Sequence, residues 1–181
     1  MRVLPTAIDG LLVIEPVVHE DARGWFCESW NAARFAEAGL SIEFVQDNHS
    51  RSRKGVLRGL HFQQPNPQGK LVRVVSGAVF DVAVDLRVGS PTYGVWEGIE
   101  LSADNRRMAW IPRGFAHGFL ALEDGTDVLY KCDAPWSGSD EHTLAWDDPD
   151  LAIDWPLGGA APILSEKDAS GKTLQQVEAL A

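Results

Sequence analysis

The feature that most constrains the fold is a series of short apolar runs in the middle of the chain. They are rich in β-branched residues, and within 79–86 apolar and polar residues alternate as on a half-buried strand. Turn-forming residues interrupt the series about every 8–12 residues, the spacing of short strands in all-β domains. We therefore predict an all-β fold, an antiparallel barrel or sandwich. The predicted strands are 71–75, 79–86, 94–101, 107–111, 119–122 and 126–132.

The first two of these runs are separated by the turn signal Ser76-Gly77. Two strand-like runs around a short glycine-containing turn are typical of a β-hairpin. We therefore expect 71–75 and 79–86 to pair with each other.

Helix signals are few and lie towards the ends of the chain. Asn31 is placed to cap a helix over 32–38 that Gly39 would end. Ser165 and Asp168 have the spacing of a capping box, and 173–179 has the pattern of a terminal helix. No repeat or linker divides the sequence, so we expect one domain over residues 1–181 with a few short peripheral helices.

The net charge is −10, from 26 acidic and 16 basic residues. Such a balance argues against nucleic acid and against anionic membranes as partners. The charge is unevenly distributed, however. Residues 1–75 contain nine basic and eight acidic residues, whereas 76–181 contain seven and 18. The first part of the chain is therefore compatible with a local anion site inside an acidic protein.

Two cysteines, Cys27 and Cys132, are too few for a disulfide framework and are predicted to be buried free thiols. The N-terminal residues lack an apolar signal region, and no apolar run is long enough to span a membrane. We expect a cytoplasmic protein.

Among the five histidines, His61 has the most suggestive context, Arg58-Gly59-Leu60-His61-Phe62. A regular strand would place Arg58 and Leu60 on one face, and Gly59 and His61 on the other. A histidine inside a barrel is suited to act as a general base near neutral pH. The alternative is a buried structural histidine, and the spacing alone favours that alternative.

The segment 112–119 contains the spacing Pro-x-Gly-x-x-His, ending at His117. This spacing resembles one half of the cupin signature. The other half in metal-binding cupins is a His-x-His pair followed by Glu, but here only His61 stands in that region. Because a stable metal site uses about three or four protein ligands, we expect no metal cofactor.

Several basic and polar residues are candidates for holding an anion through their side chains, because the sequence has no glycine-rich phosphate loop. They are Arg23, Gln46, Asp47, Asn48, Arg58, Lys70 and Lys167. A solvated surface is the simpler interpretation for Arg51, Arg53, Lys54, Arg106 and Arg107. Trp136 lies in a polar loop, where it is either a stacking platform for a base or a packed anchor.

At these residues the sequence resembles the dTDP-4-dehydrorhamnose 3,5-epimerases, sugar-nucleotide enzymes with a cupin fold. The resemblance covers nearly the whole chain, in order. Its matching segments are 21–26, 44–50, 56–63, 68–73, 80–85, 110–119, 130–131 and 164–169. It implies a cupin (jelly-roll) barrel that needs no cofactor and forms homodimers in which N-terminal strands cross to the other subunit.

The resemblance also implies roles for individual residues. His61 would be the base that removes the C3 and C5 protons, oriented by Asp168, and Tyr130 the acid on the opposite face. Lys70 would stabilise the enolate, and Asp81 would be a second carboxylate near His61. Trp136 would stack on thymine. The remaining substrate-binding residues would be Arg23, Glu28, Gln46, Asp47, Asn48, Arg58, His117, Glu141 and Lys167.

These roles agree with what inversion beside a ketone requires. A base takes the α-proton, a cation stabilises the enolate, and an acid returns a proton to the other face. We therefore expect conversion of dTDP-4-dehydro-6-deoxy-D-glucose to dTDP-4-dehydro-L-rhamnose. The alternatives are a mono-epimerase that inverts one carbon, a metal-dependent cupin, and a non-catalytic sugar-nucleotide binding module.

Overall fold

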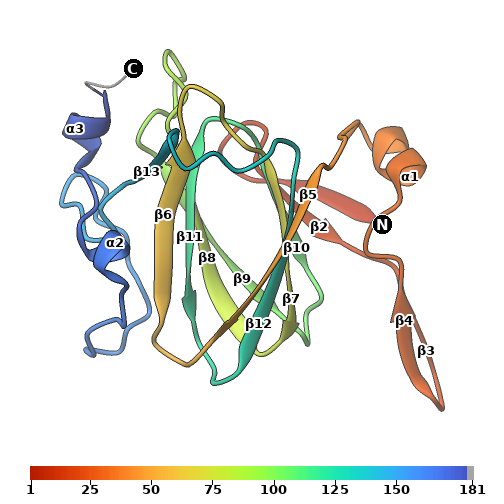
Figure 1. Cartoon of the computed structure of the whole chain (residues 1–181). Helices are drawn as coiled ribbons and strands as arrows, with labels where there is room; N and C mark the ends of the chain where they lie inside the picture. Colours follow the sequence, from red (N-terminus) through yellow and green to blue (C-terminus); the bar gives the residue numbers. More distant parts are fainter. Residues whose placement is uncertain (179–181) are drawn as a thin grey trace.

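The structure, a computed structural model, describes residues 1–178, excluding the side chain of Glu178. Two antiparallel sheets face each other and roll into a barrel (Figure 1). One sheet has the order β1-β2-β10-β7-β12-β5, and the facing sheet has the order β13-β6-β11-β8-β9. The first comprises Arg2–Pro5, Leu12–Glu15, Met108–Ile111, Lys70–Ser76, Thr126–Cys132 and Gln46–Ser52. The second comprises Glu141–Thr143, Leu57–Gln63, Phe115–Ala121, Ala78–Asp85 and Trp96–Ser102.

The predicted all-β class and the antiparallel cupin, or jelly-roll, barrel are confirmed. Each of the six predicted strands is present, although β11 begins at Phe115, four residues earlier than expected. The early start follows from burial, because every residue of β11 is buried and its pattern shows no alternation.

The predicted hairpin of 71–75 and 79–86 is wrong. β7 pairs with β10 and β12, whereas β8 pairs with β11 and β9 in the facing sheet. The chain crosses between the sheets at Gly77, which has a φ of +71° and no room for a Cβ against Thr126. β7 is buried at Leu71, Val72 and Val74, and nearly all of β8 is buried, so their apolar patterns do not identify their partners.

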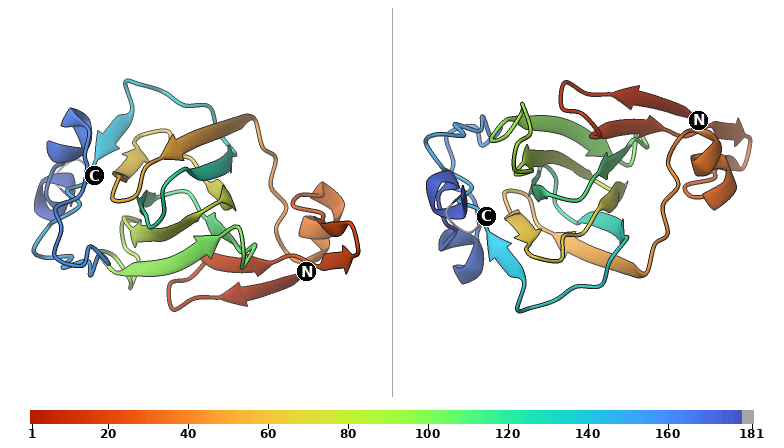
Figure 2. Two further views of the ribbon diagram at one scale, coloured as in Figure 1. Left: turned by 90° about the horizontal axis from the view of Figure 1, so that it is seen from below. Right: turned by 90° about the horizontal axis from the view of Figure 1, so that it is seen from above.

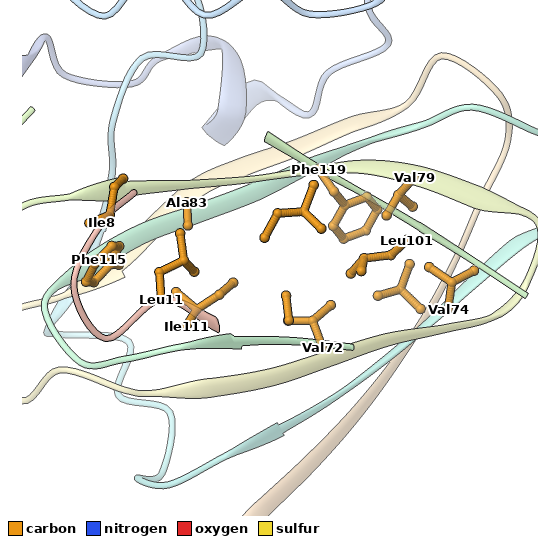
Figure 3. Packing of buried hydrophobic residues seen from close by; sticks show 13 residues of the cluster. Ile8, Leu11, Val72, Val74, Val79, Ala83, Leu101, Ile111, Phe115 and Phe119 are labelled. Carbon is orange, nitrogen blue, oxygen red and sulfur yellow. The ribbon is translucent and has the colours of Figure 1, made fainter. Parts of the chain in front are cut away.

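The space between the two sheets is filled at one end by apolar side chains (Figure 3). Branched residues from both sheets interdigitate with Phe115 and Phe119 of β11. The labelled members are Ile8, Leu11, Val72, Val74, Val79, Ala83, Leu101, Ile111, Phe115 and Phe119. This packing closes one end of the barrel and leaves the rest for a polar cavity.

Residues 144–178 cover the outer face of the β6-β11-β8 sheet (Figure 2). Leu57, Leu60 and Phe62 of β6 pack against this segment through Trp155 and Val177. The buried carboxylate of Asp148 accepts hydrogen bonds from the N–H groups of residues 150, 151 and 174. The segment is therefore fixed to the barrel, and it carries α2, Glu166–Ala169, and α3, Leu174–Glu178.

The N-terminal part carries α1, Ala32–Glu37, and a separate hairpin of β3, Val18–Asp21, with β4, Gly24–Cys27. The hairpin projects away from the barrel (Figure 1). Its apolar side chains Trp25 and Phe26 are 52% and 67% exposed. Isolated two-stranded hairpins are marginally stable in water, so this one needs a covering surface.

The predicted helix caps are present. Asn31 accepts a hydrogen bond from the N–H of Arg34, and Ser165 accepts one from the N–H of Asp168. Gly39 has a φ of +86°, as expected after the end of α1. The terminal helix begins at residue 174, and the predicted last position, Ala179, lies outside the described residues.

Within residues 1–178, no helix is long and apolar enough to cross a membrane. The two thiols are free, as predicted, but only Cys132 is buried, whereas Cys27 is partly exposed.

Candidate active site

A cavity of about 610 Å³ lies between the two sheets, beside the apolar core. It is lined from three sides: by both sheets, by the loop after β12, and by α2. Eleven of the predicted site residues line it, namely Gln46, Asn48, Arg58, His61, Lys70, His117, Tyr130, Trp136, Glu141, Lys167 and Asp168. Residues far apart in sequence thus converge on one polar pocket.

The prediction for the faces of β6 is wrong, because Arg58 and His61 both line the cavity. The register against β11 pairs His61 with His117 but Arg58 with Phe119, so between these pairs two residues of β6 oppose one of β11. This β-bulge shifts the alternation by one residue. As a result, Leu60 packs outwards with Leu57 instead of sharing a face with Arg58.

Gly59 makes the bulge possible. Its φ is +110°, and a Cβ there would lie 2.6 Å from both the Cα of Gly118 and the carbonyl oxygen of His117. No side chain fits at that distance, so β6 and β11 approach each other only with glycine at this position.

His61 and Asp168 form a close pair at the edge of β6. The Nε2 atom of His61 lies 2.7 Å from Oδ1 of Asp168. The same oxygen accepts a hydrogen bond from the N–H of Gly59 at 3.2 Å, and Oδ2 accepts one from the hydroxyl of Ser165 at 2.7 Å. The carboxylate is therefore held from three directions, as required to orient an imidazole.

The electrostatics of this pair favour an ionised carboxylate. Burial by itself would raise the pKa of Asp168, but hydrogen bonds from His61, Ser165 and Gly59 lower it to about 2. An ionised Asp168 stabilises the protonated form of the His61 ring, which is the form produced when the ring accepts a proton.

His117 forms a second pair with Asp81, the second carboxylate expected near His61. The Nε2 atom of His117 lies 2.9 Å from Oδ2 of Asp81, and both side chains are buried. Asp81 is therefore placed to orient His117, the histidine opposite His61. Because His117 is the cross-strand partner of His61, two histidine–carboxylate pairs stand side by side on one sheet.

Tyr130 and Lys70 reach the cavity from the facing sheet, on β12 and β7. Burial raises the pKa of the Tyr130 phenol, which keeps it a proton donor. Burial lowers the pKa of the Lys70 ammonium, although the neighbouring acidic groups oppose this effect. A phenol and an ammonium thus face an imidazole across the cavity.

Alternate residues of β5 point into the cavity, and their polar groups are interconnected. The amide of Gln46 donates to Asn48, and its carbonyl oxygen accepts from the N–H of Trp136. Ser52 accepts a hydrogen bond from Nε of Arg58. These contacts fix Arg58 and the loop that carries the 58%-exposed indole of Trp136.

Glu141 and Lys167 form an ion pair of 2.7 Å at the rim of the cavity. Burial acts to raise the pKa of Glu141, but contacts with Lys167, His61 and Trp136 lower it overall. The pair links β13 to α2 and leaves the charged head of each residue next to the cavity.

Three predicted binding residues have side chains outside this cavity. Arg23 lies at the tip of the β3–β4 hairpin, paired with Asp21 at 2.6 Å and 90% exposed. Glu28 bonds Asn31 and Arg34. Asp47 points to the outer face of β5, where it accepts from Lys131.

The surface interpretation of Arg106 is also corrected. Its side chain is 26% exposed, lies 4.7 Å from the ring of Trp25, and pairs with Glu20. Arg106 therefore supports the hairpin through a cation–π contact. Arg51, Arg53 and Lys54 are exposed, as expected.

Within the described part of the chain, no three His, Cys, Asp or Glu side chains are arranged to hold a metal ion. The Nε2 atoms of His61 and His117 are instead each paired with a single carboxylate.

Sequence reasoning missed several residues that line the cavity: Ser50, Gln68, Phe119 and Ser165. Ser165 carried a signal, because its capping-box spacing places it one helical turn before Asp168. Ser50 carried none, since a serine in a strand has no distinctive pattern.

A closed antiparallel barrel whose cavity combines a carboxylate-oriented histidine, a protonated phenol and a buried ammonium defines an enzyme that moves protons on a small ligand. More narrowly, the chain belongs to the dTDP-4-dehydrorhamnose 3,5-epimerase family, whose model matches residues 5–176. It is therefore an epimerase, an isomerase acting on dTDP-sugars.

A curated relative, the dTDP-4-dehydrorhamnose 3,5-epimerase of Methanothermobacter thermautotrophicus, is 54% identical over 97% of this chain and 95% of its own. A solved epimerase from Legionella pneumophila, in complex with dTDP-4-keto-L-rhamnose, is 52% identical. It superimposes with a TM-score of 0.95 over 99% of this chain and 95% of its own. A 3'-monoepimerase from Streptomyces bikiniensis, in complex with dTDP-quinovose, is more distant, at 36% identity. Its TM-score is 0.91, over 98% of this chain and 90% of its own.

Proposed function

We propose that this protein converts dTDP-4-dehydro-6-deoxy-D-glucose to dTDP-4-dehydro-L-rhamnose by inverting C3 and C5. The observation that carries this proposal is the convergence of His61, Tyr130 and Lys70 on one cavity from facing sheets. Membership of the epimerase family and the dTDP-sugar bound to the Legionella relative support the substrate class.

In the proposed mechanism, His61 removes the proton next to the C4 ketone. Its unprotonated ring accepts the proton, and the ionised carboxylate 2.7 Å away stabilises the resulting charge. The electrons of the broken C–H bond move into the C4 carbonyl and form an enolate, which the Lys70 ammonium stabilises.

Tyr130 then donates its phenolic proton to the opposite face of the same carbon, so the centre is inverted. A single base would return the proton to the face from which it came. The raised pKa of Tyr130 suits this role, because the phenol remains protonated at neutral pH. Exchange with water then restores both groups, and the same cycle operates at the second carbon.

Nucleotide binding is assigned to the rest of the cavity. Trp136 stacks on the thymine, and the polar groups of Gln46, Asn48 and His117 contact the ligand. Arg58 and Lys167 supply positive charge for the diphosphate. Both cations lie at a cavity inside a protein of net charge −10, which suits a small anion better than a polyanion.

The working unit is proposed to be a homodimer with exchanged N-terminal strands. Support comes from the projecting hairpin, whose exposed Trp25 and Phe26 need a covering surface. Arg23 and Glu28 lie outside the cavity of their own chain. In a dimer they contact the ligand of the partner subunit.

The cytoplasm is the proposed compartment. Free thiols persist in reducing compartments, and both cysteines are unpaired in this structure.

The test is turnover of dTDP-4-dehydro-6-deoxy-D-glucose by the purified protein in D₂O, followed by NMR. Deuterium at both C3 and C5, with inversion at both after trapping by a 4-keto reductase, is the expected result. Inversion at one carbon identifies the mono-epimerase alternative, for which the Streptomyces relative is the precedent. Absence of any exchange rejects the proposal.

A further inference from the structure

Ser165 stands out because one hydroxyl makes two contacts with the same acidic residue. Its Oγ donates to Oδ2 of Asp168 at 2.7 Å and accepts from the backbone N–H of Asp168 at 3.1 Å. Ser165 is the N-cap of α2 and also lines the cavity. The cap of a one-turn helix is therefore part of the acid–base centre.

Both oxygens of the Asp168 carboxylate have hydrogen-bond partners. Oδ1 contacts His61 and the N–H of Gly59, whereas Oδ2 is bonded by Ser165. Without the Ser165 donor, Oδ2 would be left buried without a partner, and the carboxylate would be free to rotate away from the imidazole. An unsatisfied buried acceptor is costly, so such a rotation is expected.

We propose that Ser165 is a positioning residue for the reaction, which holds the Asp168 carboxylate in the orientation that makes His61 an effective base. The proposal rests on the proposed function for its kinetic consequence. Its structural part concerns the unliganded protein and is testable without substrate.

Other charged groups near the pair come from every surrounding element. Glu141 on β13 and Lys167 on α2 form an ion pair, so their opposite charges largely cancel at His61 and Asp168. His117 on β11 is occupied by Asp81. The Ser165 hydroxyl is thus the neutral donor that holds the second oxygen of the Asp168 carboxylate.

Three substitutions separate the two contacts of the hydroxyl. Ser165→Thr keeps both the cap and the donor. Ser165→Asp keeps a good N-cap acceptor but has no proton to donate and places a second negative charge at Asp168. Ser165→Ala removes both contacts. The matched control is Thr173→Ala, which removes the cap hydroxyl of α3 from the same C-terminal segment, outside the cavity.

Titration of the His61 ring by NMR in the unliganded protein is the first measurement, with the signal assigned through His61→Asn. We expect the midpoint to move to lower pH in Ser165→Ala, because the carboxylate turns away from the ring, and to stay unchanged in Ser165→Thr and Thr173→Ala. The second measurement is kcat for deuterium incorporation. We expect a decrease of about tenfold or more in the alanine and aspartate variants, the size of one charged hydrogen bond.

A merely structural role would lower the melting temperature of Ser165→Ala and Thr173→Ala alike and leave the His61 titration in place. That result would overturn the proposal, as would wild-type kcat in a folded Ser165→Asp protein. If the wild-type enzyme shows no exchange, the proposed function fails, whereas the NMR titration still decides whether Ser165 positions the pair.

Discussion

The Nε2 atom of His61 lies 2.7 Å from Oδ1 of Asp168, although the two residues are 107 positions apart. β6 supplies the imidazole, and the N-terminal turn of α2 supplies the carboxylate. The C-terminal segment is fixed to the outer face of the barrel, so its packing determines the geometry of the acid–base centre.

The first prediction concerns the charge of this pair. Asp168→Asn keeps the shape of the side chain but removes the charge that stabilises a protonated His61. We expect kcat to fall by about 10²–10⁴-fold, the usual contribution of an oriented acid–base group. Exchange measured by NMR in D₂O checks this. His61→Ala should abolish exchange at both carbons, and undiminished exchange in that variant contradicts the assignment of the base.

The second prediction separates proton removal from proton return. Tyr130→Phe removes the phenolic proton but leaves His61 and Lys70 in place. We expect deuterium to enter the substrate without inversion, because the carbanion is reprotonated from the His61 side. The stereochemistry of the trapped product is the measurement. Equal amounts of inverted product from Tyr130→Phe and wild type would show that another group is the acid.

The third prediction concerns Lys70. Because burial lowers the pKa of its ammonium below the ordinary value of 10.5, the cation is lost as pH rises through this lowered pKa. The alkaline limb of kcat should therefore begin below pH 10.5 and be absent in Lys70→Met. We expect Lys70→Met to lower kcat by about 10²–10³-fold, as for removal of one group that stabilises an oxyanion. An unchanged alkaline limb in this variant assigns that limb to another group.

The fourth prediction concerns the bulge at Gly59. Gly59→Ala combines an unfavourable φ of +110° with a contact of 2.6 Å to the backbone of β11. We expect the free energy of unfolding to fall by about 2 kcal/mol or more, measured by denaturant titration. Gly158→Ala is the control, because it has a φ of +60° with nothing within 4 Å. Equal losses in the two variants would mean that backbone conformation alone matters.

The fifth prediction tests the dimer by complementation. Arg23→Ala and His61→Ala chains are each expected to be impaired. A mixed dimer combines an intact His61 of one chain with an intact Arg23 of the other, so mixing should restore activity to about a quarter of wild type or less, as for statistical exchange of subunits. Sedimentation measures the oligomeric state. No gain on mixing, with exchange of subunits demonstrated, would place Arg23 outside the site.

The sequence alone determined the local structure and the family. The β-branched runs and turn residues predicted the strands, because strand formation depends on short-range alternation and turn chemistry. The caps at Asn31 and Ser165 were equally local. The ordered match over nearly the whole chain identified the epimerase family and with it most of the cavity residues.

The tertiary structure alone decided which elements meet. Period-two alternation describes the faces of a strand but not its neighbours, so the predicted pairing across Ser76-Gly77 was wrong. The bulge at Gly59 reversed the expected faces of β6, because one extra residue shifts every side chain after it. Contacts between distant segments also determined three features of the site. Asp81 pairs with His117, and Ser165 hydrogen-bonds the carboxylate next to His61. Arg23 lies outside the cavity of its own chain.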